Sequence, residues 1–236
     1  MTNVVDGMDQ TLIDLVKVKT TRPARYLPVA ERPPHSTARL VLRSFTADDL
    51  AGFHEIRAQP EVMVFTSQGR PDASPAETLA KMDTFLSPRG DDIYVLAVVE
   101  RATGALVGTI SSHLRVDLLG WPALGYMLRR EAWGKGYATE MVAGFLEVYW
   151  ALPREEALVE LAVDSSTVPA AAAAAAREGG ELMTVTEQLA AITIDSNAPS
   201  QNVLLKAGFK LVKKWIDTEN APLLPLCFAY SLEKPH

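Results

Sequence analysis

The chain has 236 residues, of which 48% are hydrophobic and 22% are charged, and its formal net charge is −6. This composition is typical of a globular protein with a sizeable core, and it excludes the disordered and fibrous classes. The acidic balance disfavours a nucleic-acid partner, because general nucleic-acid binders carry a strong basic patch, and it suits a cationic or neutral partner.

The chain has a single cysteine, Cys227. One cysteine excludes an intramolecular disulfide and a cysteine-based metal cluster, and it favours a reducing compartment. Residues 1–30 show no secretory signal pattern, and no stretch approaches 18 apolar residues without a charge. We therefore expect a cytoplasmic protein with no membrane partner and no metal site.

The first 36 residues differ from the rest and are predicted to form an arm or linker. Residues 8–18 can form a short amphipathic helix, and the prolines that follow forbid a continuous helix. This arm packs either on the domain or on a partner subunit, so a homodimer is left open.

From residue 37 onward, strand and helix patterns alternate. A strand over 39–45 leads into a cap signal at 46–49 and a helix to about residue 58. The run Ser74-Pro75-Ala76-Glu77 predicts a second helix start. That helix should bury Leu79, Met82, Phe85 and Leu86. Two strands follow at 93–100 and 105–112, joined as a hairpin.

The second half predicts a further strand at 123–129 and a helix that ends near residue 150. Residues 151–190 are ambiguous: 158–163 suits a strand or a helix, and the alanine run with residues 187–190 suggests an inserted helical stretch. The remaining predictions are a strand at 191–195, a helix at 199–207 closed by Gly208, and antiparallel strands at 210–217 and 225–232 with a turn around Glu219 and Asn220. Three consecutive strands before the long helix favour an α/β fold with a mixed sheet over a parallel doubly wound one.

The most informative motif lies between a predicted strand and a predicted helix, and it reads Trp133-Gly134-Lys135-Gly136-Tyr137-Ala138-Thr139. Two glycines permit a tight turn whose N–H groups converge, and the helix start adds unpaired N–H groups and a positive dipole end. Such a turn suits phosphates, although an ordinary glycine turn is the alternative. The segment lacks the Walker A pattern and the third glycine of a dinucleotide fingerprint.

A second motif covers residues 195–209. Asn197 and Ser200 stand at a predicted helix start, where they can cap the helix or reach a ligand. Lys206 follows about one and a half turns later.

With these motifs in place, the chain resembles a GCN5-related N-acetyltransferase, of the branch named after the ribosomal-protein alanine acetyltransferases. The matching pieces are residues 37–45 with Glu61-Val62-Met63, residues 124–127 running into 133–140, and Asn197-x-x-Ser200 ending at 206–209. The resemblance covers roughly 37–150 and 190–232.

The resemblance implies one domain over 37–236, with a twisted, mixed and mostly antiparallel sheet flanked by helices. Its fourth and fifth strands should splay apart around acetyl-CoA, which leaves as CoA. An alanine-rich insertion at about 155–190 would shape the choice of acceptor. Trp133 replaces the family's usual Arg or Gln, so backbone N–H groups must grip the pyrophosphate. The implied cofactor-binding residues are Met127, Leu128, Arg129, Trp133, Gly134, Lys135, Gly136, Tyr137, Ala138, Thr139, Asn197, Ser200, Asn202 and Lys206.

The family resemblance implies direct attack by an amine, from a protein N-terminus or a small molecule, on the thioester. Leu205 stands near the place of the family's tyrosine acid, so Ser200 is the substitute proton donor. His113 is the first candidate base, Glu131 the second, and Asp195 is a turn residue rather than a base. A non-catalytic acyl-CoA-binding domain is the alternative function, whereas a nucleotide hydrolase is disfavoured by the missing Walker lysine.

Overall fold

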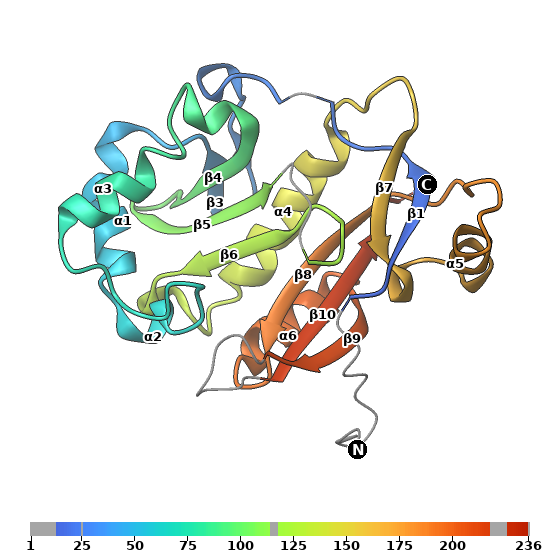
Figure 1. The fold of residues 1–236 in the computed structure, drawn as a ribbon. Coiled ribbons are helices and arrows are strands. Elements are labelled where there is room, and N and C mark those ends of the chain that lie inside the picture. Colours follow the sequence, from blue (N-terminus) through green and yellow to red (C-terminus); the bar gives the residue numbers. More distant parts are fainter. Residues whose placement is uncertain (1–12, 25, 114–117, 218–225, 236) are drawn as a thin grey trace. The chain divides into compact units, whose positions relative to one another are not determined.

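The computed structural model describes residues 13–24, 26–113, 118–217 and 226–235. The chain divides into two compact units, and Figure 1 labels helices and strands of both. Unit 1 comprises Met1–Ala24, Arg115–Ala123 and Pro153–His236, and unit 2 comprises Arg25–Leu114 and Leu124–Leu152. Each unit is therefore assembled from segments that are distant in the sequence.

Unit 2 contains a five-stranded sheet in the order β2-β3-β4-β5-β6, with every neighbouring pair antiparallel. Its strands are β2 (His35–Ser36), β3 (Leu40–Arg43), β4 (Ile93–Glu100), β5 (Leu106–His113) and β6 (Leu124–Leu128). The six inner residues of β4 are all buried, which explains its unbroken apolar sequence.

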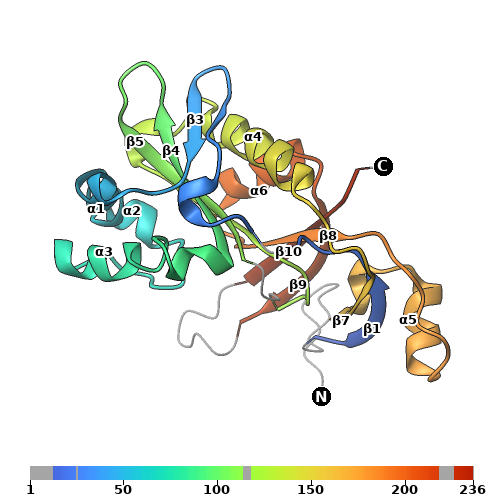
Figure 2. The ribbon, with the colours of Figure 1, turned by 90° about the horizontal axis from the view of Figure 1, so that it is seen from above.

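Helices cover both faces of this sheet. The first face carries α1 (Leu50–Arg57), α2 (Pro60–Met63) and α3 (Pro75–Met82), and α4 (Tyr137–Ala151) lies on the other (Figure 2). Under α1 and α3, the rings of Phe45 and Phe53 have centroids 5.2 Å apart. On the α4 side, Tyr94 and Phe145 have centroids 6.0 Å apart. Successive residues of β4 thus supply two apolar layers.

Unit 1 contains a three-stranded antiparallel sheet and a two-stranded one. The first has the order β8 (Gln188–Ile194), β10 (Leu226–Glu233), β9 (Lys210–Ile216), and α6 (Ala198–Lys206) follows β8 in the chain. The second pairs β1 (Leu15–Thr20) with β7 (Val159–Asp164), and α5 (Ala170–Arg177) packs beside it. One buried cluster joins β1, β7, α5 and the fully buried Trp121.

The predictions for the N-terminal arm and the insertion need correction. The helix over 8–18 is wrong in its described part, because Leu15–Thr20 forms β1 and pairs with β7. Residues 8–12 lie outside the described residues. The ambiguous stretch at 158–163 lies in the strand β7, which begins at Val159. Of the inserted helical stretch, the alanine run forms α5 as predicted, whereas residues 188–190 belong to β8. Pairing with a distant strand overrides the local helical pattern in both places.

The expected α/β fold with a mostly antiparallel sheet arrangement is confirmed: the described strands form three antiparallel sheets, and parallel pairing occurs at isolated bridges such as Ala123 with Ala190. The predicted burial of Met82 and Phe85 is confirmed, but Leu79 is 41% exposed, because the buried face of α3 carries Thr78 and Met82. The predicted hairpin at 93–112 and the final antiparallel pair are confirmed, whereas the turn at Glu219 and Asn220 lies outside the described residues. No helix in the described ranges is long and apolar enough to cross a membrane.

Candidate functional site

The loop before α4 has the conformation that its glycines permit. Gly134 and Gly136 have φ angles of +71° and +79°, in the left-handed region that side chains rarely adopt. Residues 134–136 are exposed, and a Cβ on Gly134 would meet nothing within 4 Å. Backbone conformation rather than crowding therefore requires glycine at position 134.

The N-terminus of α4 carries no side-chain cap. Gly136 is its N-cap residue, and the N–H of Glu140 donates to the Gly136 carbonyl. The amides of Tyr137, Ala138 and Thr139 precede that bond and have no partner within the helix. In contrast, Ser74 caps α3 and Asn197 caps α6. The helix that follows the glycine loop therefore offers its first amides and its positive dipole end to an anion.

The peptide groups of β6 alternate between β5 and the outer edge of the sheet. The Arg129 N–H donates to the Val107 carbonyl, and Met127 lies opposite Thr109 in the same register. Antiparallel alternation therefore turns the peptide groups of Tyr126 and Leu128 toward the outer edge. Of the segment 127–129 predicted to pair with pantetheine, the Arg129 amide is already used within the sheet.

The Trp133 side chain fixes the start of the loop to β6 and to the apolar core of unit 2. Its indole N–H donates to the Leu128 carbonyl at 2.8 Å, and the ring packs against the cluster under α1 and α3. The Arg130 guanidinium lies 5.0 Å from the ring centroid. These contacts commit the indole N–H within the protein, so they agree with a phosphate grip made by backbone groups.

An arginine that the sequence motifs did not indicate lies beside the loop. Arg39, just before β3, donates from Nε to Glu140 at 2.7 Å and from Nη1 to the Lys135 carbonyl at 2.9 Å. Arg39 and Glu140 are 101 residues apart, so no local spacing reveals the pair.

Glu131, the second candidate base, is already engaged. Its carboxylate accepts hydrogen bonds from the Gln59 amide and the Arg129 guanidinium. Its pKa lies below the usual value because of a hydrogen bond to its own backbone and these two side-chain donors. A carboxylate stabilised in its charged form is a weaker proton acceptor at neutral pH.

In unit 1, the second motif forms a capped helix start. The Asn197 Oδ1 accepts a hydrogen bond from the Ser200 N–H at 3.3 Å, so Asn197 acts as a cap. Ser200 is half-buried, and Asn202 and Lys206 are exposed on α6. Asp195 is exposed and accepts from the Ser196 N–H, which fits the expected turn role.

The predicted site residues divide between the two units. Residues 127–129 and 133–139 come together around the start of α4 in unit 2, and Asn197, Ser200, Asn202 and Lys206 come together on α6 in unit 1. His113, the first candidate base, is the last residue of β5 and lies opposite Ile93. Its side chain lies outside the described part of the structure.

Known proteins to which the chain is similar are acetyltransferases. A family model described as "Acetyltransferase (GNAT) domain" matches residues 39–210. A GNAT-family acetyltransferase from Bacillus anthracis is similar in structure, with TM-score 0.60 and 16% identity, over 86% of this chain and 99% of that one. A putative ribosomal-protein-serine acetyltransferase from Vibrio cholerae gives TM-score 0.56 and 20% identity, over 85% and 97%. Spermidine N-acetyltransferase from Vibrio cholerae, solved with CoA and spermine, gives TM-score 0.59 and 11% identity, over 84% of this chain and 97% of that one.

The family match spans most of the chain, and the chain therefore belongs to the GNAT acetyltransferases. Acetyl-CoA is the acetyl donor of this family. The similar structures share the α/β fold with antiparallel sheets and flanking helices.

Proposed function

We propose that this protein transfers the acetyl group of acetyl-CoA to a primary amine, either a protein N-terminus or a small amine. The observation that carries the proposal is the start of α4. Two left-handed glycines precede a helix without a side-chain cap, in a chain whose family uses acetyl-CoA.

The residues present suit the pyrophosphate of CoA. Gly134 and Gly136 keep the loop free of side-chain bulk, and the amides of residues 137–139 supply donors at the positive end of α4. The Leu128 N–H faces away from β5 and suits the amide-bearing arm of the same molecule, whereas the Leu128 carbonyl is held by the Trp133 indole. Within unit 2, the proposed anion site at the start of α4 thus follows the edge strand β6 directly in the chain.

Acetyl-CoA, when bound, supplies an activated thioester. The chain must then orient that thioester, exclude water and accept the proton lost by the amine. Backbone donors can polarise the thioester carbonyl, and Ser200 is our proposed donor to the departing thiolate. We keep His113 as the first proposed base, because Glu131 is held as a stabilised carboxylate.

Binding of CoA to a glycine-loop variant tests the cofactor site. In Gly136→Glu, a side chain and a negative charge enter the loop, so calorimetry should show CoA affinity lost or sharply weakened. Gly69→Glu is the control for a charged side chain at a glycine of positive φ; a Cβ at Gly69 would meet nothing within 4 Å, whereas a Cβ at Gly136 would lie 3.4 Å from Arg39 Nη2. Equal CoA affinity in wild type and Gly136→Glu would overturn the assignment of the loop.

Release of free thiol from acetyl-CoA over a panel of amines tests turnover. Spermidine and an N-terminal ribosomal-protein peptide are the first acceptors to try, since similar structures bear those names. Thiol release with at least one amine supports the enzyme. Tight CoA binding with no release over a broad panel would favour the alternative, a non-catalytic acyl-CoA-binding domain.

We also propose that the alanine-rich insertion influences the choice of acceptor. Deleting it would disturb the fold, because Ala172 and Ala173 of α5 belong to the buried cluster of unit 1. The exposed Ala171 and Ala174 can carry charge instead. If Ala171→Glu with Ala174→Glu left the acceptor ranking unchanged, this role of the insertion would be abandoned.

A further inference from the structure

We propose that Arg39 is a positioning residue for CoA: anchored on Glu140, it holds the Lys135 carbonyl and thereby aims the Gly136 amide at the pyrophosphate. This inference rests on the proposed function. It concerns a residue outside the glycine loop and outside α4, and it assigns a role to a charge pair that is not among the candidate site residues indicated by the sequence.

Arg39 contacts the loop region at three positions. Its Nη1 donates to the Lys135 carbonyl at 2.9 Å, and its Nε donates to the Glu140 carboxylate at 2.7 Å. Its guanidinium also lies 4.5 Å from the ring centroid of Tyr137. One planar group thus reaches the middle of the glycine loop and the first turn of α4 together, which suits the rigid fork of arginine.

The contact with the Lys135 carbonyl has a consequence for the next amide. In a trans peptide, the carbonyl of one residue and the N–H of the next point in opposite directions. Because Arg39 holds the Lys135 carbonyl, the Gly136 N–H points away from Arg39. A Gly-Lys-Gly loop without such a restraint can rotate this peptide, since glycine accepts φ angles of either sign.

Glu140 supplies the fixed point for Arg39. Its carboxylate accepts from the Thr37 hydroxyl at 2.6 Å and from the Arg39 backbone N–H at 2.7 Å, besides the guanidinium. Burial raises its pKa, but these hydrogen bonds outweigh burial, so the net pKa is lowered and the group is charged at neutral pH. This negative charge stands in the first turn of a helix whose N-terminus would receive an anion. Arg39 neutralises it there.

The Tyr137 side chain is held from the other side. Its hydroxyl donates to the Glu100 carboxylate of β4, while Arg39 covers its ring. Arg39 therefore packs onto a side chain that the sheet already fixes, and the loop is tied to β3 and β4 rather than to α4 alone.

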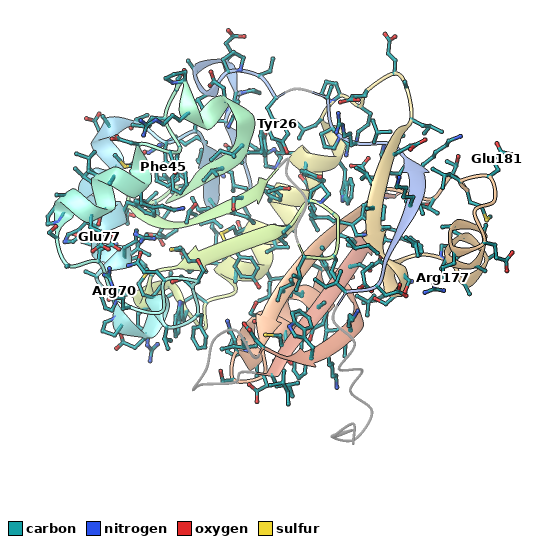
Figure 3. The ribbon with its side chains drawn as sticks, viewed as in Figure 1. Tyr26, Phe45, Arg70, Glu77, Arg177 and Glu181 are labelled. Carbon is teal, nitrogen blue, oxygen red and sulfur yellow. The ribbon has the colours of Figure 1, made fainter. Side chains whose placement is uncertain are left out.

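Unit 2 contains a matched pair without a glycine loop. Arg70 donates to Glu77 at 2.8 Å, and Glu77 stands in the first turn of α3 and also accepts from a backbone amide, that of Ala73 (Figure 3). Arg70→Gln, like Arg39→Gln, removes an arginine from a glutamate in the first turn of a helix, so the two variants should affect helix stability alike. Arg70 contacts no residue of the proposed site.

The first experiment measures CoA affinity by calorimetry for wild type, Arg39→Gln, Arg39→Lys and Arg70→Gln. We expect the dissociation constant to rise about tenfold in Arg39→Gln and to stay near wild type in Arg70→Gln. Arg39→Lys should recover little, since one ammonium group does not reproduce the fork. Full recovery with lysine, or no loss with glutamine, would overturn the positioning role.

Glu140→Gln separates position from charge. If Arg39 acted only as a positive charge near the pyrophosphate, removing the negative charge of Glu140 would strengthen CoA binding. If Glu140 anchors Arg39, the same variant should bind CoA several-fold more weakly. The two roles therefore predict opposite signs, and stronger binding in Glu140→Gln would overturn the inference.

Two further readouts locate the effect. The loss in Arg39→Gln should be equal for CoA and 3′-dephospho-CoA, since both carry the pyrophosphate. A loss of affinity seen only with CoA would assign Arg39 to the 3′-phosphate instead.

In NMR relaxation of the free protein, the Gly136 amide should become more mobile in Arg39→Gln but not in Arg70→Gln. If wild type does not bind CoA, the proposed function fails; if wild type binds and Arg39→Gln binds equally well, only the inference about Arg39 fails.

Discussion

Lys213 and Asp164 form an ion pair within unit 1, with Nζ 2.6 Å from Oδ2. Lys213 lies on β9 and Asp164 ends β7, so the pair connects the three-stranded sheet to the two-stranded sheet. Asp164 is fully buried and also accepts hydrogen bonds from Ser166 and from the Asp14 N–H. Burial raises the pKa of Asp164, but the hydrogen-bond donors, with Lys213 first among them, lower it by more. The net pKa is therefore below the usual value.

Lys213→Met should destabilise the protein strongly, because it leaves a buried carboxylate without its cation. Removing one partner of a buried pair costs on the order of 3 kcal/mol of unfolding free energy. Urea unfolding would measure the loss. Lys214→Met is the control, since Lys214 is exposed and lies over the Phe228 ring instead. A Lys213→Met loss no larger than that of the control would contradict the structural importance of the pair.

Acid should weaken unit 2 through Asp72. Burial raises the pKa of Asp72, but hydrogen bonds from Arg57, Thr78 and Gln68 lower it to a net value of about 2. A depressed pKa stabilises the fold above the unfolded value near 3.8, and this stability is lost as pH falls toward 2. The contribution is about 2 kcal/mol at neutral pH.

The check is urea unfolding between pH 5 and pH 2 for wild type and Asp72→Asn. The stability gap between the two proteins should narrow as the pH falls. A gap independent of pH would show that Asp72 does not carry this dependence.

The tautomer of His54 follows from the same network. Asp72 is charged and only accepts, so the Thr78 hydroxyl donates to it at 2.6 Å. The Thr78 oxygen, 2.8 Å from His54 Nδ1, must then accept, which places the His54 proton on Nδ1. Nitrogen-15 NMR at pH 8 should show the Nδ1–H tautomer in wild type and a shift toward the common Nε2–H form in Thr78→Val. A dominant Nε2–H form in wild type would contradict the assignment.

Gly120→Ala should disrupt unit 1. Gly120 has φ of +81°, and a Cβ there would lie 2.1 Å from the Ala162 carbonyl oxygen of β7. We expect a loss of more than about 3 kcal/mol, because backbone strain and a backbone clash combine. Gly179→Ala has positive φ without any clash and should cost only about 1 kcal/mol. Similar urea midpoints for the two variants would show that the clash is relieved cheaply.

Several elements were predictable because local chemistry decides them. The Ser74 cap with Pro75 and Glu77 begins α3 as expected, and Gly208 closes α6 with φ of +91°. The Gly134 and Gly136 turn before α4 was also predicted from its residues, since positive φ is a property of glycine itself. The motif between β6 and α4 was thus readable from adjacent positions.

The sequence by itself determined the glycine loop, the helix starts and the family to which they point. Only the tertiary structure decided that residues 15–20 form a strand against β7, and that Arg39 reaches Glu140 and the Lys135 carbonyl. These partners are more than 90 residues apart in the chain. Strand pairing and side-chain clamps join distant segments once the core has formed, so no local spacing encodes them, whereas caps and left-handed turns are settled within a few residues.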